Sequence, residues 1–217
     1  MKTSARVVVI GGGVVGCSVL YHLAKNGWTD VILLERQELT SGSSWHAAGG
    51  LFTTTRPNAV AELHNYTFQI YRDLEQESDQ SCGFHHTGGL NICRTEEEIS
   101  SNQAMQSACR RLGIESHFIS KEEAQKRAPI LNTSFFLNAL WEENGGHVDP
   151  ASATQAFAIA ARKLGAIIYR KTPVLGTTQL PDKSWEIKTN NGNIKTCLLY
   201  TSPSPRDATL SRMPSSA

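Results

Sequence analysis

The feature that most constrains the fold is a glycine-rich turn between an apolar run and a helical pattern near the amino terminus. Residues 5–10 are Val-rich, as in a buried parallel strand, and residues 14–26 place apolar side chains at helical spacing. Between them residues 11–16 read GGGVVG, which fits G-x-G-x-x-G. A second apolar run, residues 30–34, ends at Glu35. This order predicts a nucleotide-binding β-α-β unit.

Each position of this motif has a physical task. Gly11 makes a tight turn, Gly13 lets backbone N–H groups approach a pyrophosphate, and Gly16 allows close packing of helix on strand. The helix start adds partial positive charge, and the carboxylate of Glu35 can accept both ribose hydroxyls of an adenosine. We therefore expect dinucleotide contacts from Gly11, Gly13, Val14, Val15, Gly16 and Glu35. The motif by itself does not separate FAD from NAD.

Composition excludes several classes of protein. The net charge of +1 gives no electrostatic basis for binding nucleic acid or anionic lipid, and no apolar run suits a membrane helix. The five cysteines form no C-x-x-C pair, so we expect reduced thiols without a metal site or disulfides. Only residues 1–4 precede the first strand, which leaves no room for a signal peptide. We expect a cytoplasmic protein, or one of the mitochondrial matrix if a eukaryotic transit peptide is missing.

The carboxyl-terminal run Cys197–Ala217 differs from the rest of the chain. It is rich in serine and proline, has no helical or strand period, and resembles the translation of a transposase-type sequencing adapter. We interpret it as a non-native tail and place the end of the biological sequence near Thr196. The chain would then be an amino-terminal fragment, inactive by itself.

The pattern up to Thr196 predicts a mixed α/β fold, with a Rossmann-like FAD/NAD(P)-binding domain and an interleaved substrate domain of sheet and helices. We expect residues 1–80 in the nucleotide-binding part, 81–147 in the substrate domain, and 148–196 back in the nucleotide-binding part. Further helices are expected at 58–76, 95–112, 121–127 and 150–164. Further strands are expected at 84–94 around a Gly88-Gly89 turn, 135–141, 166–170 and 184–189, with a hairpin at Asn191-Gly192.

A loop of small residues follows the first β-α-β unit. Residues 41–50 read SGSSWHAAGG, and such glycines and hydroxyls let a loop wrap closely around a ligand. Ser43 and Ser44 could donate to phosphate oxygens. His46, beside Trp45, has a second interpretation as a structural histidine that holds the loop by hydrogen bonds.

Residues 35–49, ERQELTSGSSWHAAG, resemble the dimethylglycine and sarcosine dehydrogenase group of the D-amino-acid-oxidase-like FAD-dependent oxidoreductases. In that group the histidine of the WHxAG stretch is bonded to the flavin 8α-methyl, which implies covalent FAD at His46. The resemblance extends to residues 83–90, to GHVDP at 146–150 and to KTPVLG at 171–176, whose valine would contact adenine. The double glycine at 49–50 departs from the group's usual single glycine. The resemblance adds these FAD contacts: Arg36, Gly42, Ser43, Ser44, Trp45, His46, Ala47, Ala48, Gly49 and Val174.

The implied reaction is oxidation of the N-methyl C–N bond of dimethylglycine or sarcosine, with hydride transfer to the flavin. The expected partners are a small amine substrate and an electron-transfer flavoprotein or dioxygen, with folate bound by a part of the protein absent from this chain. The alternative is another FAD-dependent amine, amino-acid or 2-hydroxy-acid oxidase or dehydrogenase of the same fold. A nicotinamide-dependent enzyme would leave the 41–50 loop unexplained, and no partner surface supports a non-catalytic binding module.

No residue of the chain is assigned a catalytic role from the sequence. His147 with Asp149 could do proton chemistry, but we favour a helix-entry turn in which Asp149 caps and His147 packs. His85 and His86 are interpreted as strand residues. Residues 141–143 are interpreted as a solvated strand end.

Overall fold

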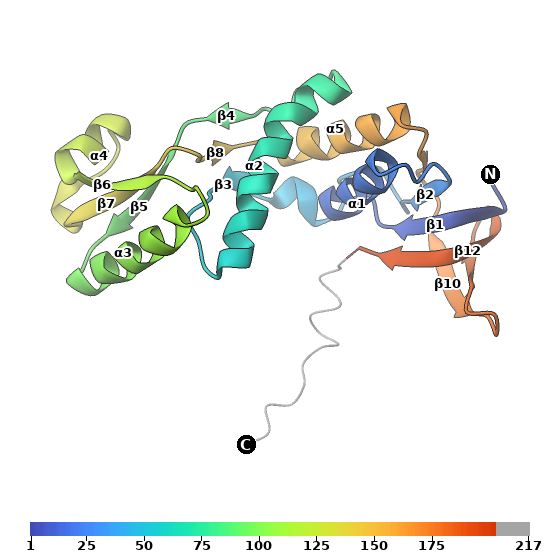
Figure 1. The fold of residues 1–217 in the computed structure, drawn as a ribbon. Helices are drawn as coiled ribbons and strands as arrows, with labels where there is room; N and C mark the ends of the chain where they lie inside the picture. The colour runs from blue at the N-terminus through green and yellow to red at the C-terminus, as the bar shows by residue number, and fades with distance from the viewer. Residues whose placement is uncertain (203–217) are drawn as a thin grey trace. The chain divides into compact units, whose positions relative to one another are not determined.

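The computed structural model describes residues 1–202, which divide into two compact units (Figure 1). The first unit contains Met1–Ala48, Leu74–Cys82 and the chain from Pro150 onward, and the second contains Gly49–Asp73 and Gly83–Asp149. The boundary at Gly49 lies earlier than the expected one at residue 81. The reason is local packing, because Ala61 of the 49–73 segment is buried against Cys109 and Ile114 of the second unit.

The first unit is built on a six-stranded mixed sheet. Its strands are β1 (Ser4–Ile10), β2 (Val31–Leu34), β9 (Ile167–Tyr169), β10 (Val174–Gln179), β11 (Trp185–Thr189) and β12 (Gly192–Thr201). They lie in the order β10-β11-β12-β1-β2-β9, in which β12, β1, β2 and β9 are parallel and β10-β11-β12 is an antiparallel meander. All four residues of β2 are buried, as expected for a parallel strand covered on both faces. The α/β fold class is therefore confirmed.

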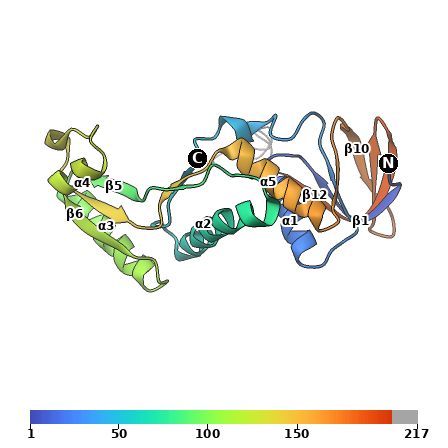
Figure 2. The same cartoon turned by 90° about the horizontal axis from the view of Figure 1, so that it is seen from above.

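The first unit also contains helical segments, of which α1 and α5 contact the sheet. They are α1 (Val14–Lys25), the short 3-10 helix η1 (Ser43–His46), the end of α2 (Asn58–Ser78) and α5 (Pro150–Lys163). Helices α1 and α5 run side by side in both views (Figure 2). Tyr21 of α1 packs on Phe157 of α5 with ring centroids 5.4 Å apart. On the sheet itself, Val8, Ile32 and Ile194 lie at the centre of a buried apolar cluster.

The adapter-like run Cys197–Ala217 is partly described. Its first residues continue β12 as far as Thr201, with Leu198 to Thr201 paired in parallel register with Val7 to Ile10 of β1. Leu199 packs against the buried cluster of the sheet. Residues 203–217 lie outside the described residues. The expected hairpin is present between β11 and β12, but Thr189 pairs with Gly192, so the turn begins one residue earlier than predicted.

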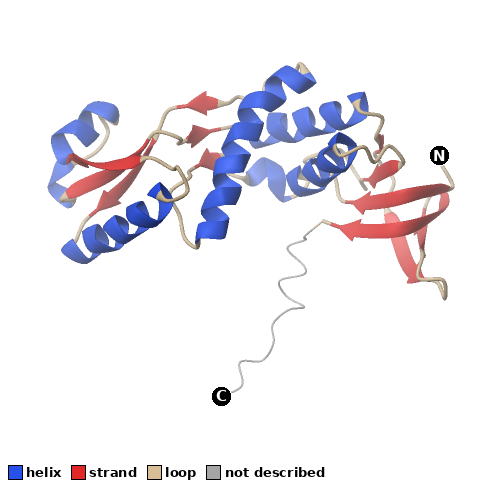
Figure 3. Cartoon of the chain, viewed as in Figure 1, coloured by secondary structure: helices blue, strands red, loops and turns tan. Residues whose placement is uncertain are grey.

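The second unit contains two three-stranded antiparallel sheets (Figure 3). One has the order β3-β8-β4 and the other β5-β7-β6. The strands are β3 (Gly50–Leu51), β4 (His85–His86), β5 (Gly89–Cys93), β6 (Ser116–Ser120), β7 (Asn138–Glu142) and β8 (Gly146–His147). The helices are the first part of α2, α3 (Glu96–Arg110), α4 (Lys121–Arg127) and the 3-10 helix η2 (Thr133–Phe135). The hydroxyls of Thr95 and Ser120 cap α3 and α4.

Three sequence expectations need correction in this unit. The 84–94 segment is not one strand around a turn, because β4 pairs with β8 and β5 pairs with β7 in the other sheet. The strand expected at 135–141 begins later, because Asn132 accepts a hydrogen bond from Ser134 N–H and starts a 3-10 turn. Strand β6 was not predicted. The interpretation of residues 141–143 as a solvated end is wrong for Trp141 and Glu142, which are both buried.

Candidate functional site

The glycine turn lies where β1 meets α1 in the first unit. Gly11 has a φ of 109°, a conformation that favours glycine, and its N–H donates to the carbonyl of Leu34 at 2.9 Å. A Cβ at Gly16 would lie 1.9 Å from the carbonyl oxygen of Gly11, so only glycine allows this approach of helix and turn. The backbone geometry therefore agrees with the tight turn expected at Gly11 and the close packing expected at Gly16.

Gly12 is a third required glycine that the sequence argument passed over. A Cβ there would lie 2.6 Å from Cδ2 of Leu39 and 2.9 Å from Cβ of Glu35. Its N–H donates to Oε2 of Glu35 at 2.7 Å, and its carbonyl accepts from Thr40 N–H at 3.0 Å. The signal was available in the sequence, since the variable position of the motif is itself glycine.

The start of α1 is open to a ligand. Gly13 precedes the helix with an extended backbone and provides no side-chain cap. The N–H of Val14 donates to Oγ of Ser44 at 2.8 Å, whereas those of Val15 and Gly16 belong to the first-turn groups that a helix leaves without intrahelical partners. Val15 is 41% exposed. This helix terminus can therefore bind an anionic group through backbone N–H groups and the helix dipole.

Glu35 is buried at the end of β2 with both oxygens oriented by backbone donors. Oε2 accepts from Gly12 N–H and Oε1 accepts from Gln37 N–H at 2.8 Å. A carboxylate oxygen has more than one lone-pair site, so each can still accept a hydroxyl. The carboxylate thus fits the ribose-binding role that its position predicts, and the hydrogen bonds fix its direction.

Val174 and Arg36 are two further predicted FAD contacts near Glu35. The N–H of Thr172 donates to the carbonyl of Glu35 at 2.8 Å, so the segment leading into β10 runs beside the end of β2. Val174 is partly buried on the apolar cluster of the sheet, whereas Arg36 is exposed. The structure thus brings Val174 close to Glu35, whereas nothing in the described part of the chain gives Arg36 a role.

The 42–49 loop forms the short helix η1 beside α5. Ser44 is buried and accepts from Val14 N–H, which leaves its own hydroxyl hydrogen free to be directed elsewhere, whereas Ser43 is exposed. Trp45 is 60% exposed, and its ring lies 4.0 Å from that of His46 between centroids. Gly42, Ala47 and Ala48 are also exposed, and Gly49 already belongs to the second unit.

His46 is therefore an exposed imidazole two positions after the serine that holds the helix start. If His46 only held the loop by hydrogen bonds, its side chain would be expected to be buried within the loop. Its exposure beside Trp45 fits a side chain that is available to a ligand.

Cys17, in the first turn of α1, is chemically inert. Its side chain is fully buried, and burial, followed by the nearby carboxylate of Glu35, raises its pKa to about 12. The thiol is thus neutral at physiological pH and is not a nucleophile. Across residues 1–202 no group of three or more His, Cys, Asp and Glu side chains could hold a metal ion.

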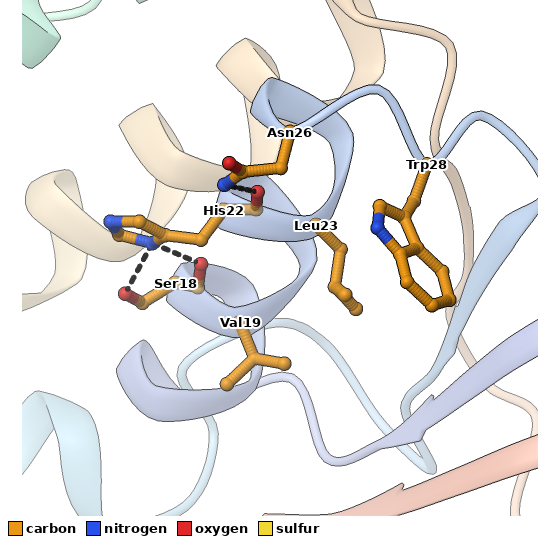
Figure 4. A pocket seen from close by; sticks show the side chains of 6 residues that line it. All are labelled: Ser18, Val19, His22, Leu23, Asn26 and Trp28. Atoms are coloured by element: carbon orange, nitrogen blue, oxygen red, sulfur yellow. Dashed lines mark hydrogen bonds between the residues drawn. The ribbon is translucent and has the colours of Figure 1, made fainter.

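One hollow of the first unit lies elsewhere on α1 (Figure 4). It is lined by the middle and end of the helix and by Trp28, and not by the first turn. The residues are Ser18, Val19, His22, Leu23, Asn26 and Trp28. The ring of His22 contacts the carbonyl of Ser18 at 2.7 Å, and the Arg6 guanidinium lies 4.1 Å from the Trp28 ring centroid. We assign no function to this open surface.

In the second unit, His147 pairs directly across β8 and β4 with His85, and their rings stack at 4.7 Å. Both side chains are exposed. No helix in the described part of the chain is long and apolar enough to span a bilayer.

Comparison with known proteins agrees with this geometry. The family model of the FAD dependent oxidoreductases, DAO, matches residues 6–202. The chain belongs to this family. It is 37% identical over 195 residues to dimethylglycine dehydrogenase of Rattus norvegicus, covering 89% of this chain and 23% of that protein. It is 34% identical over 202 residues to sarcosine dehydrogenase of Homo sapiens, covering 90% of this chain and 22% of that protein.

Among solved structures, L-proline dehydrogenase from P. horikoshii superposes with a TM-score of 0.86 and 28% identity. That match covers 93% of this chain and 53% of the other. The chain thus spans less than a quarter of the two curated relatives and about half of this structural relative. Membership of the family supports FAD, rather than NAD, as the cofactor, a choice that the glycine motif alone left open.

Proposed function

We propose that a full-length protein carrying this chain oxidises the N-methyl C–N bond of a small N-methylated glycine, dimethylglycine or sarcosine, with FAD linked to His46. The observation that carries the proposal is the exposed His46, two positions after the serine that holds the start of α1. The similarity to dimethylglycine and sarcosine dehydrogenases supports the choice of substrate class.

Different residues of the first unit would bind different parts of FAD. The first turn of α1 and Gly13 would hold the pyrophosphate, and Glu35 would accept the ribose hydroxyls. Val174 would contact the adenine. Ser44 fixes the loop to the helix start, so that His46 is presented at the same end of the unit.

His46 would hold FAD through a bond from an imidazole nitrogen to the flavin 8α-methyl, in place of one of its C–H bonds. Formation of that bond would release two protons and would need an oxidant such as dioxygen for the two electrons. When bound, FAD supplies the two-electron acceptor for the substrate. The substrate loses a hydride from its N-methyl carbon, and water then converts the iminium to formaldehyde, a proton and the demethylated amine.

The remaining partners follow from the same resemblance. We propose an electron-transfer flavoprotein or dioxygen as the final acceptor, and folate as a carbon acceptor in a part of the protein outside this chain. The two dehydrogenases are named as mitochondrial proteins, which favours the matrix if the source is eukaryotic.

The test is a substrate panel on the full-length protein. We expect dimethylglycine or sarcosine to give one formaldehyde for each pair of electrons passed to an acceptor dye. Glycine betaine is the matched control, because its quaternary nitrogen has no lone pair to assist hydride loss. Oxidation of neither N-methylglycine would contradict the proposal.

A second candidate is another amino-acid dehydrogenase of the same fold, which the superposition on L-proline dehydrogenase favours. L-Proline belongs in the same panel, since its oxidation releases no formaldehyde. Turnover of L-proline with no formaldehyde from the methylated glycines would make this candidate the better account.

A further inference from the structure

The side chain next to His46 is a large aromatic ring that lies outside the core of the first unit. Trp45 is 60% exposed, although folding usually buries most of a tryptophan side chain. Its indole contacts the imidazole of His46, with 4.0 Å between the ring centroids and 39° between the ring planes. Since Trp45 contributes little to the core, this contact is the interaction that calls for an explanation.

The contact is closer than the local chain geometry requires. Both residues lie in η1, and a 3-10 helix has three residues per turn, so successive side chains leave its axis about 120° apart. The two rings therefore meet because both side chains turn toward each other. The centroids of contacting aromatic rings usually lie about 4.5–7 Å apart. A spacing of 4.0 Å thus indicates direct contact, and the indole occupies space beside the imidazole.

The backbone that carries the two rings is held to the glycine turn of the same unit. The buried Oγ of Ser44 accepts from Val14 N–H at 2.8 Å. Within the loop, the carbonyl of Ser44 accepts from Ala47 N–H at 3.2 Å. The backbone on either side of Trp45 and His46 is therefore fixed, and the freedom that remains is rotation of the His46 side chain about its own χ angles.

Rotation of an exposed imidazole spreads its two nitrogens over many positions. Within residues 1–202 His46 forms no hydrogen bond or ion pair, so its contact with Trp45 is what limits these rotations. A reaction at one ring nitrogen needs that nitrogen to be close to the reacting atom and correctly directed. A displacement of about 1 Å can slow such a step by roughly a hundredfold, so an indole that restricts the imidazole can accelerate it.

We propose that Trp45 is a positioning residue for flavin attachment, which acts by orienting the imidazole of His46. The proposal rests on the proposed link between FAD and His46. Formation of that link joins an imidazole nitrogen to the 8α-carbon and breaks one C–H bond, while two protons go to solvent and two electrons go to dioxygen. Trp45 takes no part in these bond changes and affects only their rate.

The test measures attachment in the full-length protein under air. FAD is added to the apoprotein, and acid-stable flavin is followed over time at several FAD concentrations. The maximal rate reports the covalent step, and the FAD concentration that gives half of this rate reports binding. In Trp45→Ala we expect the maximal rate to fall by about tenfold to a hundredfold, with the half-saturating FAD concentration close to that of the wild type.

Two further variants separate orientation from other effects. Trp45→Phe keeps an aromatic ring beside His46 and should recover most of the lost rate. Trp28→Ala is the matched control, because it removes a tryptophan of the first unit that lines the hollow on α1, and it should attach flavin at the wild-type rate. Since Trp45 is exposed, Trp45→Ala should change Tm by less than about 2 °C.

The outcomes distinguish this proposal from the proposed function. If the wild type forms no acid-stable flavin, the link through His46 and the role of Trp45 both fail. If the wild type forms it and Trp45→Ala has the same maximal rate, only the role of Trp45 is overturned. A change confined to the half-saturating FAD concentration would also overturn that role, because Trp45 would then contact FAD itself. Equal slowing in Trp45→Phe, or a large fall in the Tm of Trp45→Ala, would overturn it too.

Discussion

Alanine at two glycines of one motif should affect different properties, stability at Gly16 and FAD binding at Gly13. Gly16 lies inside helix α1, where alanine is normally favoured over glycine by about 1 kcal/mol. Here, however, the new Cβ would lie 1.9 Å from the carbonyl oxygen of Gly11, a backbone atom that cannot move without opening the turn. We expect Gly16→Ala to destabilise the fold by at least about 4 kcal/mol, in the range of severe steric substitutions.

Gly13→Ala is the matched comparison. Gly13 has a φ of −80°, which alanine adopts readily, and the new Cβ would meet only Oγ of Ser44, at 3.0 Å. The gain of roughly 0.4–1 kcal/mol from a less flexible unfolded chain offsets this tight contact, so stability should change by less than about 1 kcal/mol. The methyl group would nevertheless occupy the approach to the pyrophosphate. Loss of hydrogen bonds to a charged group should weaken FAD binding by about tenfold to a hundredfold.

The assays are a thermal melt and a titration of FAD followed by flavin fluorescence. For a chain of this size 1 kcal/mol corresponds to about 2–4 °C in Tm, so Gly16→Ala should lower Tm by about 8–16 °C and Gly13→Ala by less than about 4 °C. A Gly16→Ala protein that melts with the wild type would refute the close approach of helix and turn. A Gly13→Ala protein that binds FAD with the wild-type affinity would refute the proposal that the pyrophosphate lies beside Gly13.

Two further predictions concern side chains of known burial. In the folded chain of 217 residues Cys197 is exposed and should react with a thiol reagent at pH 8 within minutes. The other four cysteines are buried and should react only on unfolding, so rapid labelling of more than one thiol would contradict this. Burial acts to raise the pKa of Glu77, but hydrogen bonds from Lys25 and Tyr21 outweigh it and hold the pKa below its ordinary value of 4.5. A lowered folded-state pKa stabilises the protein above the ordinary pKa and loses this contribution as the pH falls through the folded value. The Tm of the wild type should therefore fall more steeply below about pH 4.5 than that of Glu77→Gln. If Tm depends on pH in the same way in both proteins, the protonation of Glu77 is not linked to stability and the prediction is refuted.

Local patterns of the sequence predicted the first β-α-β unit well. The β1 run, the glycine turn, α1 and β2 each depend on residues within a few positions of one another, so alternation, helical spacing and glycine signals are sufficient. Helix α4 was predicted with its observed bounds, because Ser120 caps it and a proline follows its end. The candidate cofactor residues of the first unit were chosen from the same local signals and from family resemblance.

Long-range pairing explains what the sequence did not reveal. Strand β6 reads SHFIS, which has little apolar alternation, and it forms because β7 pairs along its whole length. Glu142 resembles a solvated strand end until Thr53 and Thr54, some 88 positions away, supply four donors to one of its oxygens. Likewise β4 and β5 are close in sequence but pair in different sheets. Such partners become evident only in the folded chain.

The most direct test of the account is whether flavin stays bound to the denatured protein. A full-length protein carrying this chain would be denatured in acid and separated by electrophoresis, and flavin fluorescence would be measured in the protein band. We predict fluorescence in the wild type, its loss in His46→Ala, and its retention in His117→Ala, which removes an exposed histidine of the second unit. Flavin that washes out of the wild type, or that remains attached in His46→Ala, would contradict the role assigned to His46.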